Sequence, residues 1–196
     1  MELKIFLRLL LKRWWIIVII LVVTVIATLI FTYTETPIYS SAATYVVSPS
    51  PDLQNGTSYL SGLSVLGGQP TVANTYASIA TSASIKQKAV DAMTLTPAQA
   101  INLTVNSRVQ TGTNIIEISV DGPDPLLVQA FANKIGANTI DYVSKLNGVF
   151  NLELLDGAPS PDKPIKPNKR LNLALGIAIG LVLGGGIAFL MGINEY

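Results

Sequence analysis

The segment "APSPDKPIKPNKRLNLALGIAIG" (residues 158–180) joins a proline-rich, basic stretch directly to an apolar run. Its prolines are Pro159, Pro161, Pro164 and Pro167, and its cations are Lys163, Lys166, Lys169 and Arg170. From residue 171 onward no charge follows until Glu195. Because proline fixes φ and favours extended geometry, we expect residues 158–170 to be a semi-rigid strut in front of the apolar run. A proline-rich linker with no further role is the alternative.

The apolar residues are concentrated in two uncharged runs, at residues 14–34 and 171–192. A helix needs about 20 apolar residues to cross a bilayer, so each run is long enough. The first run exceeds the apolar core of a signal peptide, about 7–15 residues, and no small-residue cleavage motif follows it. We therefore predict two membrane-spanning helices in a chain whose mean hydropathy is +0.48 and whose charged fraction is only 13%.

Small residues recur at every fourth position of the second run. They are Gly176, Gly180, Gly184, Ala188 and Gly192. Such a stripe lets the backbones of two membrane helices approach closely, which is how they associate without a hydrophobic driving force. The spacing predicts that the second run packs either on residues 14–34 or on a neighbouring subunit. A chance arrangement is the alternative, since glycine is common in membrane helices.

Basic residues flank both runs. Those expected at the membrane surface are Lys4, Arg8, Lys12, Arg13, Lys166, Lys169 and Arg170. Residues 1–13 are either an amphipathic helix lying in the surface or a plain cytoplasmic flank, and Trp14 and Trp15 mark the interface. The cations of the two flanks balance, but the first helix usually decides orientation. We expect both termini, including a 193–196 tail, in the cytoplasm of a cell-membrane protein, with residues 35–157 outside.

The region between the two runs has the pattern of a small α/β domain. Alternation predicts strands at residues 39–48, 103–110, 114–122 and 149–157, of which the middle two form a hairpin around "TGT". Helical spacing predicts helices at 71–93, 96–102 and 125–146, and residues 49–70 are expected to be a loop. The predicted class is α+β, with two membrane helices flanking a four-stranded sheet that has helices on one face.

Local signals place the ends of these helices. Ser82 or Ser84 is expected to break the 71–93 helix as an N-cap. Thr96 followed by Pro97 predicts the start of the second helix. For the 125–146 helix, the residues expected to face the sheet are Leu127, Ala130, Phe131, Ile135 and Tyr142.

The composition excludes several kinds of chemistry. The chain has no cysteine and no histidine, so disulfides, thiolate or imidazole metal sites and histidine general-base catalysis are excluded. It has no G-x-x-x-x-G-K-[ST] phosphate loop and no G-x-S-x-G nucleophile motif. Residues 35–162 carry ten acids and five bases, a net charge of −5, which argues against nucleic acid as a partner. We expect no enzymatic activity and no cofactor.

Several stretches together carry a family resemblance. They are "LRLLLKRWW", "TPIYSSAATYVVSP", "YASIATSASIKQKAV", "NIIEISVDGPDPLLVQAFANKI" and "GAPSPDKPIKPNKRLNLALGIAIGLVLGG". The chain resembles the polysaccharide co-polymerases, the Wzz-type chain-length determinants of bacterial envelopes, almost end to end. Pro161, Pro164, Pro167, Gly176 and Gly180 match the proline-rich and glycine motif of that family.

The resemblance implies a function and an assembly. It implies an extracytoplasmic α/β base domain, assembled as a homo-oligomeric ring. It also implies control of the length of O-antigen, capsule or exopolysaccharide chains beside a polysaccharide polymerase, without catalysis. The long helical extension of better-known members is expected to be replaced here by the 49–70 loop, and no tyrosine-kinase domain is expected. The resemblance is therefore to short members that act with a separate cytoplasmic tyrosine kinase. A kinase adaptor and a structural ring unrelated to sugars are the alternatives.

Overall fold

The computed structural model describes residues 14–50, 71–146 and 150–193, and its chain divides into two units. One unit contains the two ends of the chain, up to Pro37 and from Lys166, and the other runs from Ile38 to Ile165. The expected surface helix at residues 1–13 lies outside the described residues, as does nearly all of the expected 49–70 loop.

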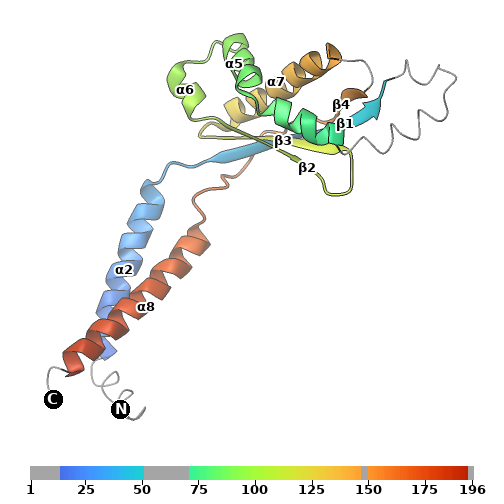
Figure 1. The fold of residues 1–196 in the computed structure, drawn as a ribbon. Helices are drawn as coiled ribbons and strands as arrows, with labels where there is room; N and C mark the ends of the chain where they lie inside the picture. The colour runs from blue at the N-terminus through green and yellow to red at the C-terminus, as the bar shows by residue number, and fades with distance from the viewer. Residues whose placement is uncertain (1–13, 51–70, 147–149, 194–196) are drawn as a thin grey trace. The chain divides into compact units, whose positions relative to one another are not determined.

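The terminal unit is a pair of long apolar helices, α2 (Trp14–Thr34) and α8 (Lys169–Ile193). Both are long and apolar enough to cross a membrane. They lie side by side and run antiparallel, because Gly176 lies against Thr28 and Gly184 against Ile17 (Figure 1). A helix fits each run because a backbone without water must satisfy its own hydrogen bonds.

The second unit is built on a four-stranded antiparallel sheet, as the alternation predicted. Its strands are β1 (Tyr39–Pro49), β2 (Thr104–Val109), β3 (Ile115–Gly122) and β4 (Phe150–Asp156), in the order β2-β3-β1-β4. The β2–β3 hairpin turns at Gly112, whose φ of +76° favours glycine. The hairpin is central in the chain but forms one side of the sheet, because β1 pairs with both β3 and β4.

Helices cover one face of this sheet (Figure 1). They are a helical stretch at residues 71–80, α5 (Ala83–Ala92), α6 (Pro97–Ile101) and α7 (Pro125–Ser144). The predicted break falls at Ser82, whose side chain accepts a hydrogen bond from the Ile85 N–H. Thr96 and Gln99 form a capping box at the start of α6, and Asp124 caps α7. The predicted fold class is confirmed.

The predicted inner face of α7 is correct at Phe131 and Ile135 but wrong at Ala130 and Tyr142, which are exposed. The buried residues of α7 are Val128, Phe131, Ala132, Ile135, Gly136, Thr139 and Val143. The physical reason is close approach: a Cβ at Gly136 would overlap the Tyr45 hydroxyl of β1. The face is therefore set by where a small residue lets the helix reach the sheet, which apolar spacing alone does not reveal.

Tyr45 is the largest fully buried side chain, with 1% of its surface exposed. Burial raises the pKa of its phenol to about 12, because a buried phenolate loses its hydration. The folded state therefore holds the neutral phenol at pH values at which an unfolded tyrosine, with a pKa near 10, already ionises.

We expect the free energy of unfolding to fall by about 1.4 kcal/mol per pH unit between pH 10 and 12 because of Tyr45. Its contribution is fully present below pH 10 and is lost as the pH rises through the folded-state pKa. Denaturant unfolding of the full chain in detergent at several alkaline pH values measures this slope. Tyr45→Phe should flatten it, whereas Tyr142→Phe, at an exposed ring, should not. Equal slopes for the two variants would contradict the assignment.

Candidate functional site

The small-residue stripe of α8 lies against α2. Among residues 169–192, the buried positions are Gly176, Gly180, Gly184, Ala188 and Gly192. A Cβ at Gly176 would lie 2.5 Å from the Thr28 Oγ1, and one at Gly184 would lie 3.0 Å from the Ile17 Cα. Within the described part of the chain, the partner of the stripe is thus the first apolar helix.

Two threonines of α2 meet glycines of the stripe, Thr28 at Gly176 and Thr24 at Gly180. A Cβ at Gly180 would overlap the Thr24 Oγ1 and lie 3.1 Å from the Leu21 Cα. The Thr24 hydroxyl donates to the Leu21 carbonyl at 2.9 Å, and the Thr28 hydroxyl donates to the Thr24 carbonyl at 2.7 Å. Because these hydroxyls are satisfied within their own helix, they can lie at an apolar contact without the cost of an unpaired donor.

Polar contacts join the end of α2 to the start of α8. The Asn172 amide donates to the Thr32 hydroxyl at 3.2 Å, and the Lys169 Nζ lies 4.8 Å from the centroid of the Tyr33 ring. The Asn168 Oδ1 accepts from the Leu171 N–H at 3.2 Å, which satisfies a donor at the start of α8. Aromatic rings and cations of this kind are typical of a membrane–water interface.

The predicted basic residues fall into two groups. Lys166, Lys169 and Arg170 are exposed at the start of α8. Lys4, Arg8, Lys12 and Arg13 lie outside the described residues. Among the described residues, the basic side chains that flank the helix pair therefore lie at the end where α2 stops and α8 begins, near Tyr33.

The proline-rich segment is divided between the two units. Pro159, Pro161 and Pro164 belong to the unit of residues 38–165, and Pro167 belongs to the helix pair. All four prolines are exposed or half-buried, so their rings are not core residues. Residues 158–165, the first half of the segment, thus belong to the sheet domain and are not a separate spacer.

Hydrogen bonds attach this first half to the domain at three places. The Asn133 side chain of α7 accepts from the Ala158 N–H at 3.0 Å and donates to the Ala158 carbonyl at 3.3 Å. The Ser41 hydroxyl of β1 donates to the Pro159 carbonyl, and the Ile165 N–H donates to the Ile38 carbonyl at 2.7 Å. The sequence reasoning missed Asn133 and Ser41, since a lone Asn in a helix and a lone Ser in a strand carry no positional signal.

The described residues contain no group of three or more acidic, histidine or cysteine side chains that could hold a metal ion. Burial raises the pKa of Tyr45 and of Tyr76, whose hydroxyl donates to the Phe150 carbonyl. The hydrogen bond to Glu117 raises the pKa of Arg108. These shifts have structural causes, and the arrangement is suited to packing and anchoring.

Comparisons with known proteins show which families and which solved structure this chain resembles. The model of the family "Chain length determinant protein" (Wzz) matches residues 1–93, and that of "G-rich domain on putative tyrosine kinase" (GNVR) matches residues 137–192. A solved "full-length bacterial polysaccharide co-polymerase" has a TM-score of 0.55 with 11% sequence identity, over 96% of each chain. At that identity the likeness concerns the fold.

Two curated relatives are similar over most of the chain. The "Capsular polysaccharide biosynthesis protein CpsC" of Streptococcus agalactiae is 25% identical over 170 residues, which are 82% of this chain and 68% of that protein. The "Probable capsular polysaccharide biosynthesis protein YwqC" of Bacillus subtilis is 28% identical over 166 residues, 83% of this chain and 65% of that protein. The chain thus spans about two thirds of the length of each.

Proposed function

Since the chain is of the Wzz type, the family of chain length determinants and polysaccharide co-polymerases, we propose that it regulates chain length in capsule polysaccharide biosynthesis. It does so without catalysis, as an oligomeric protein of the cell membrane. O-antigen and exopolysaccharide are related envelope polymers, and their chain length belongs to the same proposed role. Its partners are a polysaccharide polymerase and further copies of itself.

One observation carries this proposal. The fold likeness to a polysaccharide co-polymerase covers 96% of the chain, from the first apolar helix through the sheet domain to the second. The two family models match opposite parts of the same architecture, at residues 1–93 and 137–192. The names of the two relatives add the capsule to this agreement.

The proposed topology uses both apolar helices as membrane spans. Both α2 and α8 cross the membrane, with both termini in the cytoplasm and the sheet domain outside. The antiparallel pairing of the two helices supports this arrangement, because two antiparallel spans return the chain to the side from which it started. The exposed Lys166, Lys169 and Arg170 then lie among lipid headgroups of the outer surface.

Deletion of the gene, followed by gel electrophoresis of the surface polysaccharide, tests the proposed function. We expect the bounded length distribution of the parent to become broad and unregulated, and a plasmid copy of the gene to restore it. Total polymer sugar should change much less than the distribution, because the protein is proposed to regulate length rather than to form bonds. An unaltered length distribution in the deletion strain would contradict the proposal.

The name of the second family model favours one further candidate function. That model is named "G-rich domain on putative tyrosine kinase" and matches residues 137–192, which include all of α8 except Ile193. An adaptor that recruits and activates a separate cytoplasmic tyrosine kinase is therefore the second proposal. Capture of a cytoplasmic tyrosine kinase of the same cell by the full-length protein in detergent tests it, with a chain lacking residues 1–13 as the comparison.

A further inference from the structure

The two faces of the sheet domain differ in charge. Helices cover one face of the sheet, while the opposite, open face presents the alternate residues of every strand. The charged residues of that open face are Arg108, Glu117, Asp121, Glu153 and Asp156. Four of these five side chains are acidic, so the open face has a formal charge of −3.

Most of the open-face carboxylates keep their charge uncompensated. Arg108 Nη2 lies 2.9 Å from the Glu117 Oε2, which neutralises that pair. The other carboxylates accept from neutral groups: Glu153 from the Ser48 hydroxyl at 2.6 Å and Asp156 from the Thr44 hydroxyl at 3.2 Å. Among the described residues, no lysine or arginine forms an ion pair with Asp121, Glu153 or Asp156.

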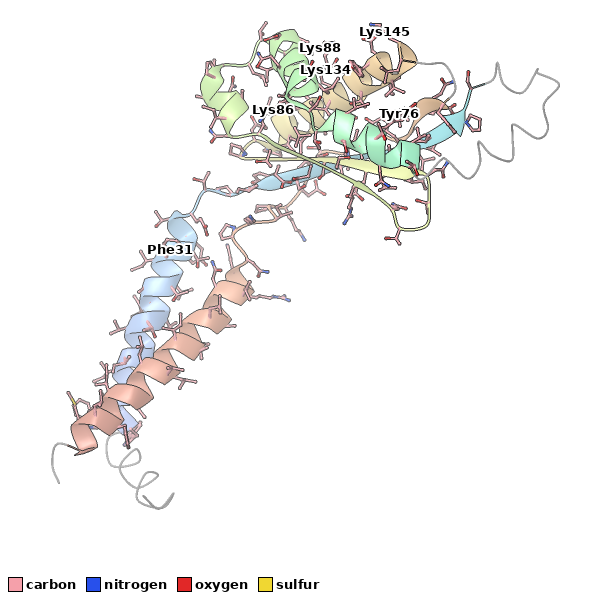
Figure 2. The ribbon with its side chains drawn as sticks, viewed as in Figure 1. Phe31, Tyr76, Lys86, Lys88, Lys134 and Lys145 are labelled. Atoms are coloured by element: carbon pink, nitrogen blue, oxygen red, sulfur yellow. The ribbon has the colours of Figure 1, made fainter. Side chains whose placement is uncertain are left out.

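The helix layer on the other side of the domain is weakly positive. The described helices α5 and α7 with their caps carry Lys86, Lys88, Lys134 and Lys145 against Asp91, Asp124 and Asp141, a formal charge of +1. Lys88 projects from α5, Lys134 from α7, and Lys145 is the C-cap of α7; Figure 2 shows all three along this layer, beyond the sheet. Lys145 is neutralised by Asp141 at 2.7 Å. Lys88 lies 5.7 Å from the centroid of the exposed Tyr142 ring, and neither Lys88 nor Lys134 has an ion-pair partner among the described residues.

Two acidic side chains of the helix layer are engaged by their neighbours. The pKa of the Asp141 carboxyl is lowered by the hydrogen bond from Lys145 and by the charges of Lys145 and Lys88. Asp141 is therefore already engaged, and the exposed Asp91 of α5 accepts from the Gln87 amide at 2.7 Å. Lys88 and Lys134 remain without an ion-pair partner among the described residues, and the Tyr142 ring lies beside Lys88.

We infer that the acidic open face of one copy docks on the lysine-bearing helix layer of the next copy. The occupant is a second copy of this chain because the two surfaces are complementary in charge and lie on opposite faces of one domain. A contact between opposite faces is heterologous, so it repeats from copy to copy and closes into a ring when the rotation allows. The inference rests on the proposed function in one respect only, namely that the regulator works as an oligomer.

Charge complementarity of this kind fixes register more than it adds affinity, and like charges placed opposite each other are costly. Reversing one face should therefore prevent assembly, whereas reversing both should restore it. Because exposed charges are screened over about 10 Å at 0.1 M salt, the effect should be largest at low ionic strength.

Two reversed variants of the full chain in detergent test the inference. The helix-face variant is Lys88→Glu with Lys134→Glu, and the sheet-face variant is Glu153→Lys with Asp156→Lys. We expect each variant alone to assemble at least roughly tenfold more weakly than the parent at low salt, by light-scattering mass. Mixed in equal amounts, they should assemble again as alternating copies, because each positive face then meets a negative one. Lys163→Glu, on the proline-rich segment, is the matched control and should assemble like the parent.

Each result decides the inference. Assembly of both variants at the parent's mass would overturn it. Failure of the mixture to assemble would also overturn it, whereas recovery in the mixture would show that both variants are folded. If the helix-face variant kept its mass but lost binding to an acidic polysaccharide such as hyaluronate, the lysines would hold polymer and the docking would be wrong. If assembly follows the charges but non-assembling variants still restore the length distribution of a deletion strain, the docking stands and the proposed role of the oligomer fails.

Discussion

Gly136→Ala is expected to destabilise the sheet domain by at least about 3 kcal/mol, at the upper end of the effects of overpacking. The new Cβ would overlap the hydroxyl and ring of Tyr45, which is fully buried in β1. Alanine is the better helix former by about 1 kcal/mol, so helix propensity alone would predict the opposite sign. Denaturant unfolding of the full chain in detergent measures the change.

The cause can be isolated by a second substitution and a matched control. Tyr45→Leu shortens the opposing side chain, so Gly136→Ala should cost about 2 kcal/mol less in that background than in the parent. Gly157→Ala is the control, because its Cβ would lie at an ordinary contact distance of 3.5 Å from the Asn133 Oδ1. Its effect should stay within about 0.5 kcal/mol. A Gly136→Ala protein as stable as the parent would show that α7 does not lie on β1 in this way.

Gly180→Leu is expected to separate α2 from α8. A leucine at this position would collide with Thr24 and with the backbone at Leu21, and overpacking of this kind costs about 1–3 kcal/mol. Gly186→Leu is the matched control in the same helix, because nothing lies within 4 Å of its Cβ. Both changes add the same apolar side chain, so membrane insertion should not differ between them.

A disulfide reports the separation, because the chain has no cysteine of its own. Thr32 and Asn172 are in side-chain contact across the pair, and cysteines at both positions should crosslink within one chain. The yield should fall roughly tenfold in the Gly180→Leu background, since every 1.4 kcal/mol is a factor of ten, and should be unchanged with Gly186→Leu. Crosslinked dimers in place of the internal bond would assign the stripe to a neighbouring subunit.

Features that depend on near neighbours could be predicted from the sequence. The two apolar runs, the β2–β3 hairpin and the caps at Ser82 and Thr96 each follow from residues within a few positions of one another. The class of the fold follows from the order of these elements. The spacing of the α8 glycines likewise marks one side of that helix as small.

Contacts between distant residues could not be predicted in this way. The bond from Ser41 to Pro159 joins positions 118 apart in the chain, and Asn133 holds Ala158 from another element. The inner face of α7 depends on Gly136 meeting Tyr45, and the charge of the open face depends on strand order.

The sequence by itself determined which segments are helices and strands, and which two are apolar enough to span a bilayer. Tertiary structure decided that β1 lies between β3 and β4, that α2 meets the α8 glycines, and that four strand carboxylates share the open face of the sheet. The physical reason is that propensity and capping act over one or two helical turns. Packing, in contrast, depends on the shapes of side chains that only the completed fold brings together.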